Sequence, residues 1–88
     1  MASKTPDTRQ SENLGSLKLL MALFDPTSLD DGDTWTSGNK GIVKTWFSSN
    51  IASILDGQMG TSFTAAGTIT FTTADNGQTG TLFVLYKG

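Results

Sequence analysis

The chain has 88 residues, with no Cys, no His, six basic and eight acidic side chains, and a formal net charge of −2. Without Cys and His it lacks the ligands of disulfides, iron–sulfur clusters and the usual zinc sites, as well as the most common general base. The basic residues are scattered and form no basic face of the kind that binds nucleic acid. The composition therefore predicts no metal, no cofactor and no nucleic-acid partner.

The length of the chain limits its core. A domain this small buries a smaller share of its surface than a larger one, and disulfides or a metal often compensate. Since neither is expected, association with copies of itself or with other proteins is the remaining route. No apolar segment is long enough to span a bilayer, and residues 1–16 lack the apolar stretch of a secretory signal. We therefore expect no membrane partner and synthesis in a cytoplasm.

Residues 1–16 are polar, contain Pro6, and have no large apolar side chain between Met1 and Leu14. Such a segment buries too little surface to offset the entropy of ordering it. We expect a flexible polar N-terminal arm over 1–16 and a single small β domain over 17–88. Two interpretations of the arm stay open: a disordered tail, or an arm that orders on a neighbouring subunit.

The first element expected after the arm is a strand over Leu17–Phe24, "LKLLMALF", with apolar residues on both faces. A helix is the alternative, because Leu, Met and Ala are good helix formers. Residues 25–41 are rich in turn residues. This segment contains three acidic residues, Asp30, Asp31 and Asp33, as calcium-binding loops do. No Glu follows at the spacing that such a loop requires, which favours a solvated turn.

The secondary structure of the middle of the chain, residues 34–55, allows more than one interpretation. We expect a short strand over Thr34–Thr36 with Trp35 inward. Residues 42–48 fit a helix or a strand. Their β-branched and aromatic side chains favour a strand, with Ile42 and Trp46 inward and Val43 and Phe47 outward. The apolar residues Ile51, Ile54 and Leu55 have the spacing of one helical turn.

The last third reads as strands separated by turns. A short strand is expected over Ser62–Ala65, and Thr68–Thr72 alternates as a half-buried strand does. Asp75-Asn76-Gly77 is a turn signal, so Gly67–Gly88 reads as a hairpin. Leu82–Tyr86 is apolar on both faces and, like Leu17–Phe24, belongs at the centre of a sheet or against another subunit. Together these elements predict a mainly β fold: a small antiparallel β-sandwich or open barrel with an extended N-terminal arm.

No catalytic constellation is recognisable. Ser and Thr are plentiful but have no His as a base, and no strand places two acids on one face. The aromatic residues Trp35, Trp46 and Tyr86 fit a hydrophobic core; a sugar-binding platform and a contact between subunits are the alternatives. The sequence therefore predicts a protein that is not an enzyme.

The order of these segments resembles a type of phage protein. The polar arm is followed by "GSLKLLMALF", "GDTWTSGNKGIVKTWF", "GTITF" and a closing "TLFVLYKG". Over residues 14–88 this resembles the small β-rich virion structural proteins of tailed bacteriophages, which include capsid decoration (cement) proteins.

The resemblance implies a protein that is made in the host cytoplasm and lies on the exterior of the capsid. Its partners would be the major capsid protein and further copies of itself, with which it would form a trimer. It would bind the assembled shell and clamp neighbouring capsomers. Alternatives are a tail, fibre or head–tail joining protein, or a glycan-binding β module displayed on the virion. The partner-binding residues that we expect come from the arm and from the two strands that are apolar on both faces: Lys4, Arg9, Leu14, Leu20, Phe24, Phe83 and Leu85.

Overall fold

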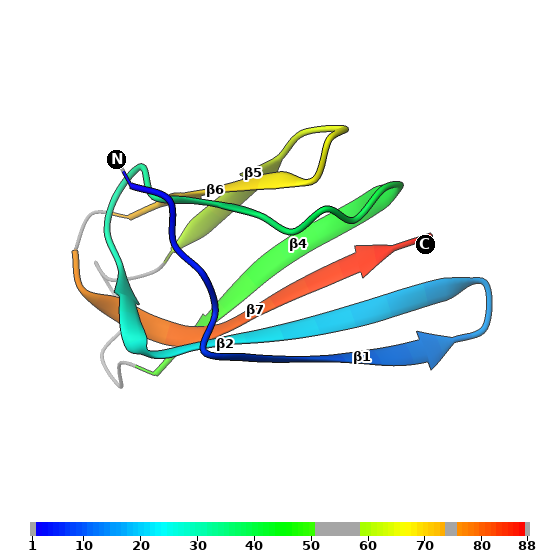
Figure 1. Ribbon diagram of the computed structural model, residues 1–88, viewed down its shortest axis with the longest axis horizontal. Coiled ribbons are helices and arrows are strands. Elements are labelled where there is room, and N and C mark those ends of the chain that lie inside the picture. Colours follow the sequence, from blue (N-terminus) through cyan, green and yellow to red (C-terminus); the bar gives the residue numbers. More distant parts are fainter. Residues whose placement is uncertain (1, 51–58, 74–75, 88) are drawn as a thin grey trace.

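A computed structural model describes residues 2–50, 59–73 and 76–87. The fold is mainly β, as predicted, with two antiparallel sheets that are compatible with a small sandwich (Figure 1). None of the described residues forms a helix long and apolar enough to cross a membrane. The strands are β1 (Thr8–Leu14), β2 (Leu17–Leu29), β3 (Thr34–Thr36), β4 (Ile42–Ser49), β5 (Gly60–Phe63), β6 (Thr68–Thr72) and β7 (Gln78–Tyr86).

The larger sheet has the strand order β1-β2-β7-β4. Its two central strands contain the two segments that the sequence shows to be apolar on both faces, which confirms their predicted central position. The register joins Leu20 to Val84 and Ala22 to Leu82, all of them buried. On each of these strands the side chains at alternate positions face the core and those between them face away from it, so the two sets of apolar residues supply both faces.

The smaller sheet has the order β3-β6-β5 and lies above the larger one in Figure 1. The predicted hairpin over Gly67–Gly88 is therefore wrong, because β6 pairs with β3 and β5 while β7 pairs with β2 and β4. The chain changes sheets at the turn, where Gly77 has the positive φ of 80° that the turn signal indicated. In this arrangement Leu82 and Val84 of β7 lie beside Ala22 and Leu20 of β2, and both are fully buried between the sheets.

The core lies between the two sheets. Among the described residues, eleven apolar side chains are buried there: Leu20, Ala22, Phe24, Leu29, Trp35, Met59, Ile69, Phe71, Leu82, Val84 and Tyr86. Phe24 makes edge-on contacts with Trp35 and Phe71, at centroid distances of 5.9 and 5.5 Å. The predictions of an inward Trp35 and of alternation in β6 are confirmed, because Ile69 and Phe71 are fully buried.

Strand β4 confirms the strand interpretation of residues 42–48. Ile42 packs against the core and Val43 is 47% exposed, as expected, but the orientation expected for Trp46 and Phe47 is reversed. A bulge lies between Ile42 and Lys44 in the pairing with β7. One extra residue in a strand shifts every later side chain to the other face. As a result Phe47 packs against the core and Trp46 is 40% exposed, the opposite of the prediction.

The N-terminal segment also differs from the prediction. Residues 8–14 form β1, an edge strand of the larger sheet, instead of an arm outside the β domain. Before it, residues 2–4 pair with Thr34 of β3, and Asp7 donates its N–H to the carbonyl of Leu23. In Figure 1 this segment runs from the smaller sheet to β1. Composition does not reveal this, because the pairing uses the backbone and every side chain of β1 is exposed.

Strand β2 continues past Phe24, where the sequence predicts its end, to Leu29. Its register with β7 shifts between Phe24 and Leu29, so Pro26 lies where no ladder bond from its nitrogen is needed. Strand β5 begins at Gly60, two residues before the predicted strand, and ends at Phe63. The helical turn predicted around Ile51, Ile54 and Leu55 lies outside the described residues.

Candidate functional site

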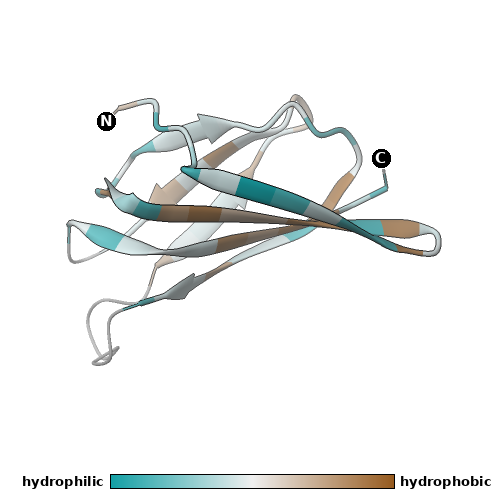
Figure 2. Cartoon of the chain, turned by 60° about the horizontal axis from the view of Figure 1, so that its bottom comes forward, coloured by the Kyte–Doolittle hydropathy of each residue, from teal (hydrophilic) through white to brown (hydrophobic). Residues whose placement is uncertain are grey.

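The most conspicuous surface of the molecule is the side of the larger sheet that faces away from the core. We call it the outer face. Side chains alternate between the two sides of a strand, so the residues between the buried ones project here. Its apolar members are partly exposed or exposed: Leu14, Leu17, Leu19, Met21, Leu23, Trp46, Phe83 and Leu85. In Figure 2 hydrophobic colour follows the central strands of this sheet, whereas β1 at its edge is mostly hydrophilic.

Strand register arranges the outer face in three complete rows that cross the sheet from β1 to β4. The first row is Glu12, Leu19, Leu85 and Lys44; the second is Gln10, Met21, Phe83 and Trp46; the third is Thr8, Leu23, Thr81 and Ser48. The centre of each row on β2 is apolar, and the ends on β1 and β4 are polar except for Trp46. An apolar centre with a polar rim is the usual anatomy of a protein–protein interface.

Two aromatic residues stack on each other on the outer face, towards its β4 side. The rings of Trp46 and Phe83 stack with their centroids 5.2 Å apart and their planes 11° apart. Two shallow hollows flank this pair. One is lined by Lys44, Trp46 and Leu85, and the other by Thr8, Arg9, Gln10, Met21, Leu23 and Thr81. Aromatic side chains held in place in this way are typical anchors of protein interfaces.

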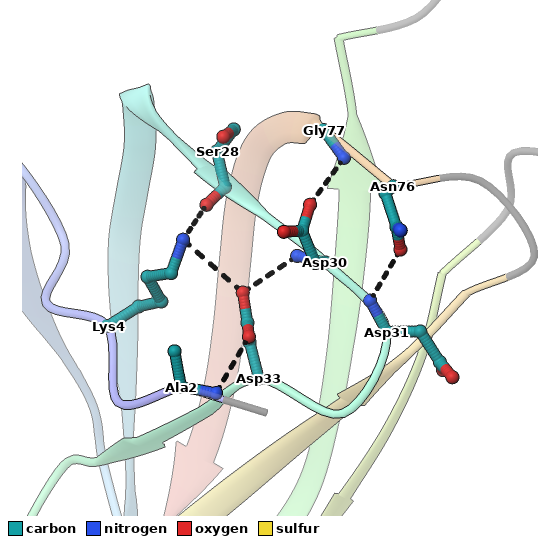
Figure 3. Close-up of polar contacts among 8 residues, drawn as sticks. All are labelled: Ala2, Lys4, Ser28, Asp30, Asp31, Asp33, Asn76 and Gly77. Carbon is teal, nitrogen blue, oxygen red and sulfur yellow. Dashed lines mark hydrogen bonds and ion pairs between the residues drawn. The ribbon is translucent and has the colours of Figure 1, made fainter.

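A second cluster of polar groups lies at one end of the sandwich, around the turn between β2 and β3 (Figure 3). Asp33 is 2% exposed, and its Oδ1 accepts a hydrogen bond from the N–H of Ala2 at 3.0 Å. Its Oδ2 accepts one from the N–H of Asp30 at 2.8 Å and lies 3.4 Å from Nζ of Lys4. Burial raises the pKa of Asp33, but the hydrogen bonds from Asp30 and Ala2 and the charge of Lys4 outweigh it, so this pKa lies below the ordinary 3.8.

The neighbouring carboxylates of this turn serve the same structural purpose. Asp30 accepts a hydrogen bond from the N–H of Gly77 at 2.8 Å, and Asp31 accepts one from the N–H of Thr73 at 3.1 Å. The turn therefore joins the N-terminal segment, β3 and the connection from β6 to β7. Among the described residues, no group of three or more acidic side chains is arranged to hold a metal ion. The prediction of a solvated turn is wrong for Asp33, which is buried.

The predicted partner-binding residues divide into three groups. Phe83, Leu85 and Leu14 lie on the outer face, and Leu14 is 55% exposed. Arg9 is exposed on the edge strand β1. The other three, Lys4, Leu20 and Phe24, have their contacts within the chain.

Leu20 and Phe24 do not contact a partner, because they are 4% and 0% exposed and belong to the core. The sequence shows that β2 is apolar on both faces but not which face turns inward, and the prediction chose the wrong one. Lys4 is bound to the carbonyl oxygen of Ser28 at 2.9 Å and to Asp33, so it has a structural partner within the chain.

Five apolar residues of the outer face are absent from the partner-binding residues predicted from the sequence: Leu17, Leu19, Met21, Leu23 and Trp46. The alternation in "LKLLMALF" contained the first four. The bulge in β4 concealed the fifth. Of the three aromatic residues considered for a sugar platform, Trp35 and Tyr86 are buried at 6% and 8% exposure, so Trp46 alone is accessible.

Comparison with known proteins gave no match to a family model, a curated protein or a solved structure.

Proposed function

We propose that this protein is a non-enzymatic structural component of a phage virion: a capsid decoration protein that binds the outside of the assembled shell and clamps neighbouring copies of the major capsid protein. The observation that carries the proposal is the outer face. Its central strands expose leucine, methionine and phenylalanine side chains, and Phe83 stacks on Trp46 of the edge strand β4. Contiguous apolar surface with a polar rim marks a site that another macromolecule covers.

The shape of the surface favours a protein partner over a small molecule. Small-molecule sites are concave and bury most of the ligand. The outer face follows one side of an antiparallel sheet, with shallow hollows beside the pair formed by Trp46 and Phe83. A structural partner with an extended surface of its own is the occupant that this geometry supports.

A clamp needs a second attachment surface, and the edge strand β1 supplies it. All seven of its side chains are exposed, and it pairs only with β2 within the described chain. An edge strand offers unpaired N–H and C=O groups to which an extended segment of another protein can add. Arg9 and Leu14 lie on this strand, so it carries two of the partner-binding residues predicted from the sequence.

The mechanism would be mass action. A protein that binds only the assembled shell stabilises that shell by its binding free energy. Many copies, each engaging through two surfaces, raise this effect through multivalency without any single strong contact.

The test is the number of copies per particle, measured by quantitative mass spectrometry on particles purified from cells that carry the gene. Hundreds of copies, lost together with shell stability when the gene is deleted, are the expected result. A few copies per particle would assign the chain to a tail or vertex and overturn the shell function. Absence from particles would overturn the virion function altogether.

A further inference from the structure

We infer that a second copy of this chain covers the outer face, and that the two sheets pack face to face about a two-fold axis parallel to their strands. This inference concerns the same face as the proposed function but requires no capsid: in solution the second copy would occupy the face that the shell covers on the particle. It holds or fails on the protein alone in solution.

Charge placement in the first row points to a second copy. Glu12 and Lys44 are the only charged residues in the three complete rows, and they lie at opposite edges of the sheet with Leu19 and Leu85 between them. Three strand spacings, about 14 Å, separate the backbones of β1 and β4 that carry them. Within the described residues, the ion pair of Lys4 with Asp33 is found, and none involves Lys44.

A two-fold axis along the strands places β1 of one copy over β4 of the other. Each row of one copy then lies opposite the same row of the second copy. Glu12 then faces Lys44 of the second copy, and Lys44 faces its Glu12, so each ion pair occurs twice. A two-fold axis across the strands reverses the rows. It leaves Glu12 opposite Thr8 and Lys44 opposite Ser48, with both charges unmatched. Electrostatic complementarity therefore selects the first arrangement.

The apolar residues fit the same arrangement. Leu19 faces Leu85 of the second copy, and Met21 faces Phe83, a combination in which sulfur packs favourably against an aromatic ring. Gln10 at one edge faces Trp46 at the other, so the large indole of one copy lies over a smaller polar side chain. Sheets that pack face to face align their strands within about 30° and lie about 10 Å apart, which keeps these rows in contact.

The area of the face is sufficient for a pair. Four strands of about eight residues cover on the order of 500 Å² measured flat, and the relief of the side chains increases the accessible area. Stable interfaces bury about 1,200–2,000 Å² in total over both partners, and the outer face of two copies reaches the lower part of that range. Apolar side chains at the centre and one ion pair at each edge then define a closed, isologous dimer.

Charge exchange tests the arrangement. Glu12→Lys and Lys44→Glu each place like charges opposite one another at both edges, and each should weaken dimerisation about tenfold. The double variant Glu12→Lys/Lys44→Glu restores opposite charges and should return to within about threefold of the unchanged protein. Sedimentation velocity on the full chain over a dilution series measures all four dissociation constants. Double-variant dimers as weak as those of the single variants would overturn the proposed register.

A zero-length carbodiimide cross-link provides an independent reading without substitution. It should yield a covalent dimer in which the carboxyl group of Glu12 is joined to Nζ of Lys44, identified by mass spectrometry. A link between these two groups within one chain would leave a monomer, so only the covalent dimer is counted. A covalent dimer linked through other residues only would overturn the face-to-face arrangement.

The variant Phe83→Ser tests the face itself. It should abolish the dimer, whereas the matched control Phe63→Ser, which removes an aromatic residue 41% exposed on the smaller sheet, should leave the dimer intact. Circular dichroism checks that both variants fold. A monomer at up to about 100 µM, a trimer, or a dimer insensitive to Phe83→Ser would overturn the inference. Shell binding plays no part in these measurements, so the proposed function can fail separately.

Discussion

Nζ of Lys4 lies 3.4 Å from Oδ2 of Asp33, a carboxylate that is 2% exposed. The pair joins the N-terminal segment to the turn between β2 and β3, and the N–H groups of Ala2 and Asp30 complete the coordination of the carboxylate. The carboxylate of Asp33, the most deeply buried charge in the described chain, therefore stabilises the fold. The surface suited to binding is the outer face, which is largely apolar.

Asp33 should make stability dependent on pH. Its pKa is lower in the folded chain than the ordinary 3.8, so the folded state is favoured while the carboxyl group is ionised in both states. That contribution is complete above pH 3.8 and is lost as the pH falls from there toward the lowered folded value. The midpoint of urea unfolding should therefore decrease as the pH is lowered below about 4.

Asp33→Asn is the matched variant for this effect. It keeps the size of the side chain but replaces one acceptor oxygen by a donor and removes the charge beside Lys4. We expect it to reduce the free energy of unfolding at pH 7 by about 1–3 kcal/mol and to flatten the loss at acidic pH. Asp7 also has a lowered pKa, chiefly through the N–H of Thr27, so a residual dependence should remain. An unchanged acid profile in Asp33→Asn would contradict this account.

Metal removal should leave the protein unaffected. The carboxylates of Asp30, Asp31 and Asp33 already accept hydrogen bonds from backbone N–H groups, which a cation would have to displace. Melting temperatures in EDTA and in calcium should agree to within about a degree. A rise of several degrees in calcium would show that the acidic turn is a binding site.

Removal of the N-terminal segment should destabilise the domain. Deleting residues 2–7 removes two backbone hydrogen bonds to Thr34, at 2.7 and 2.8 Å, and leaves Asp33 buried without Lys4. A loss of about 2 kcal/mol or more in the free energy of unfolding is expected. Lys4→Met, which keeps the length of the side chain, should reproduce part of the loss, whereas the exposed control Lys40→Met should not. A deletion with unchanged stability would restore the view of this segment as a separate arm.

Local patterns predicted the strands better than their partners. Successive apolar residues in "LKLLMALF" and "TLFVLY" located β2 and β7 and favoured central positions, because side chains alternate between the two faces of a strand and these segments are apolar on both. Which side of β2 faces inward depends on where the smaller sheet packs, and no local pattern contains that. The same is true of β6 and β7, which are close in sequence but pair in different sheets.

The candidate surface was predictable only in part, for related reasons. Phe83, Leu85 and Leu14 were identified, since their strands were correct. Trp46 was missed because the bulge after Ile42 adds one residue and reverses the faces of β4. Strand β1 was missed because its place is fixed by backbone hydrogen bonds, which polar side chains neither require nor reveal.

The bulge in β4 provides the last prediction, because it assigns opposite roles to two adjacent aromatic residues. Phe47 packs against the core, with its ring 6.0 Å from that of Phe71 at an edge-on angle of 78°, whereas Trp46 is 40% exposed. Phe47→Ala should lower the free energy of unfolding by about 2–3 kcal/mol, through lost burial and the cavity left behind. Trp46→Ala should cost less than about 1 kcal/mol in the dilute monomer and should act on dimerisation instead. Urea unfolding at low concentration measures the first effect and sedimentation the second. If Trp46→Ala were the more destabilising change in the monomer, the strand would lack the bulge and the outer face would lose its aromatic centre.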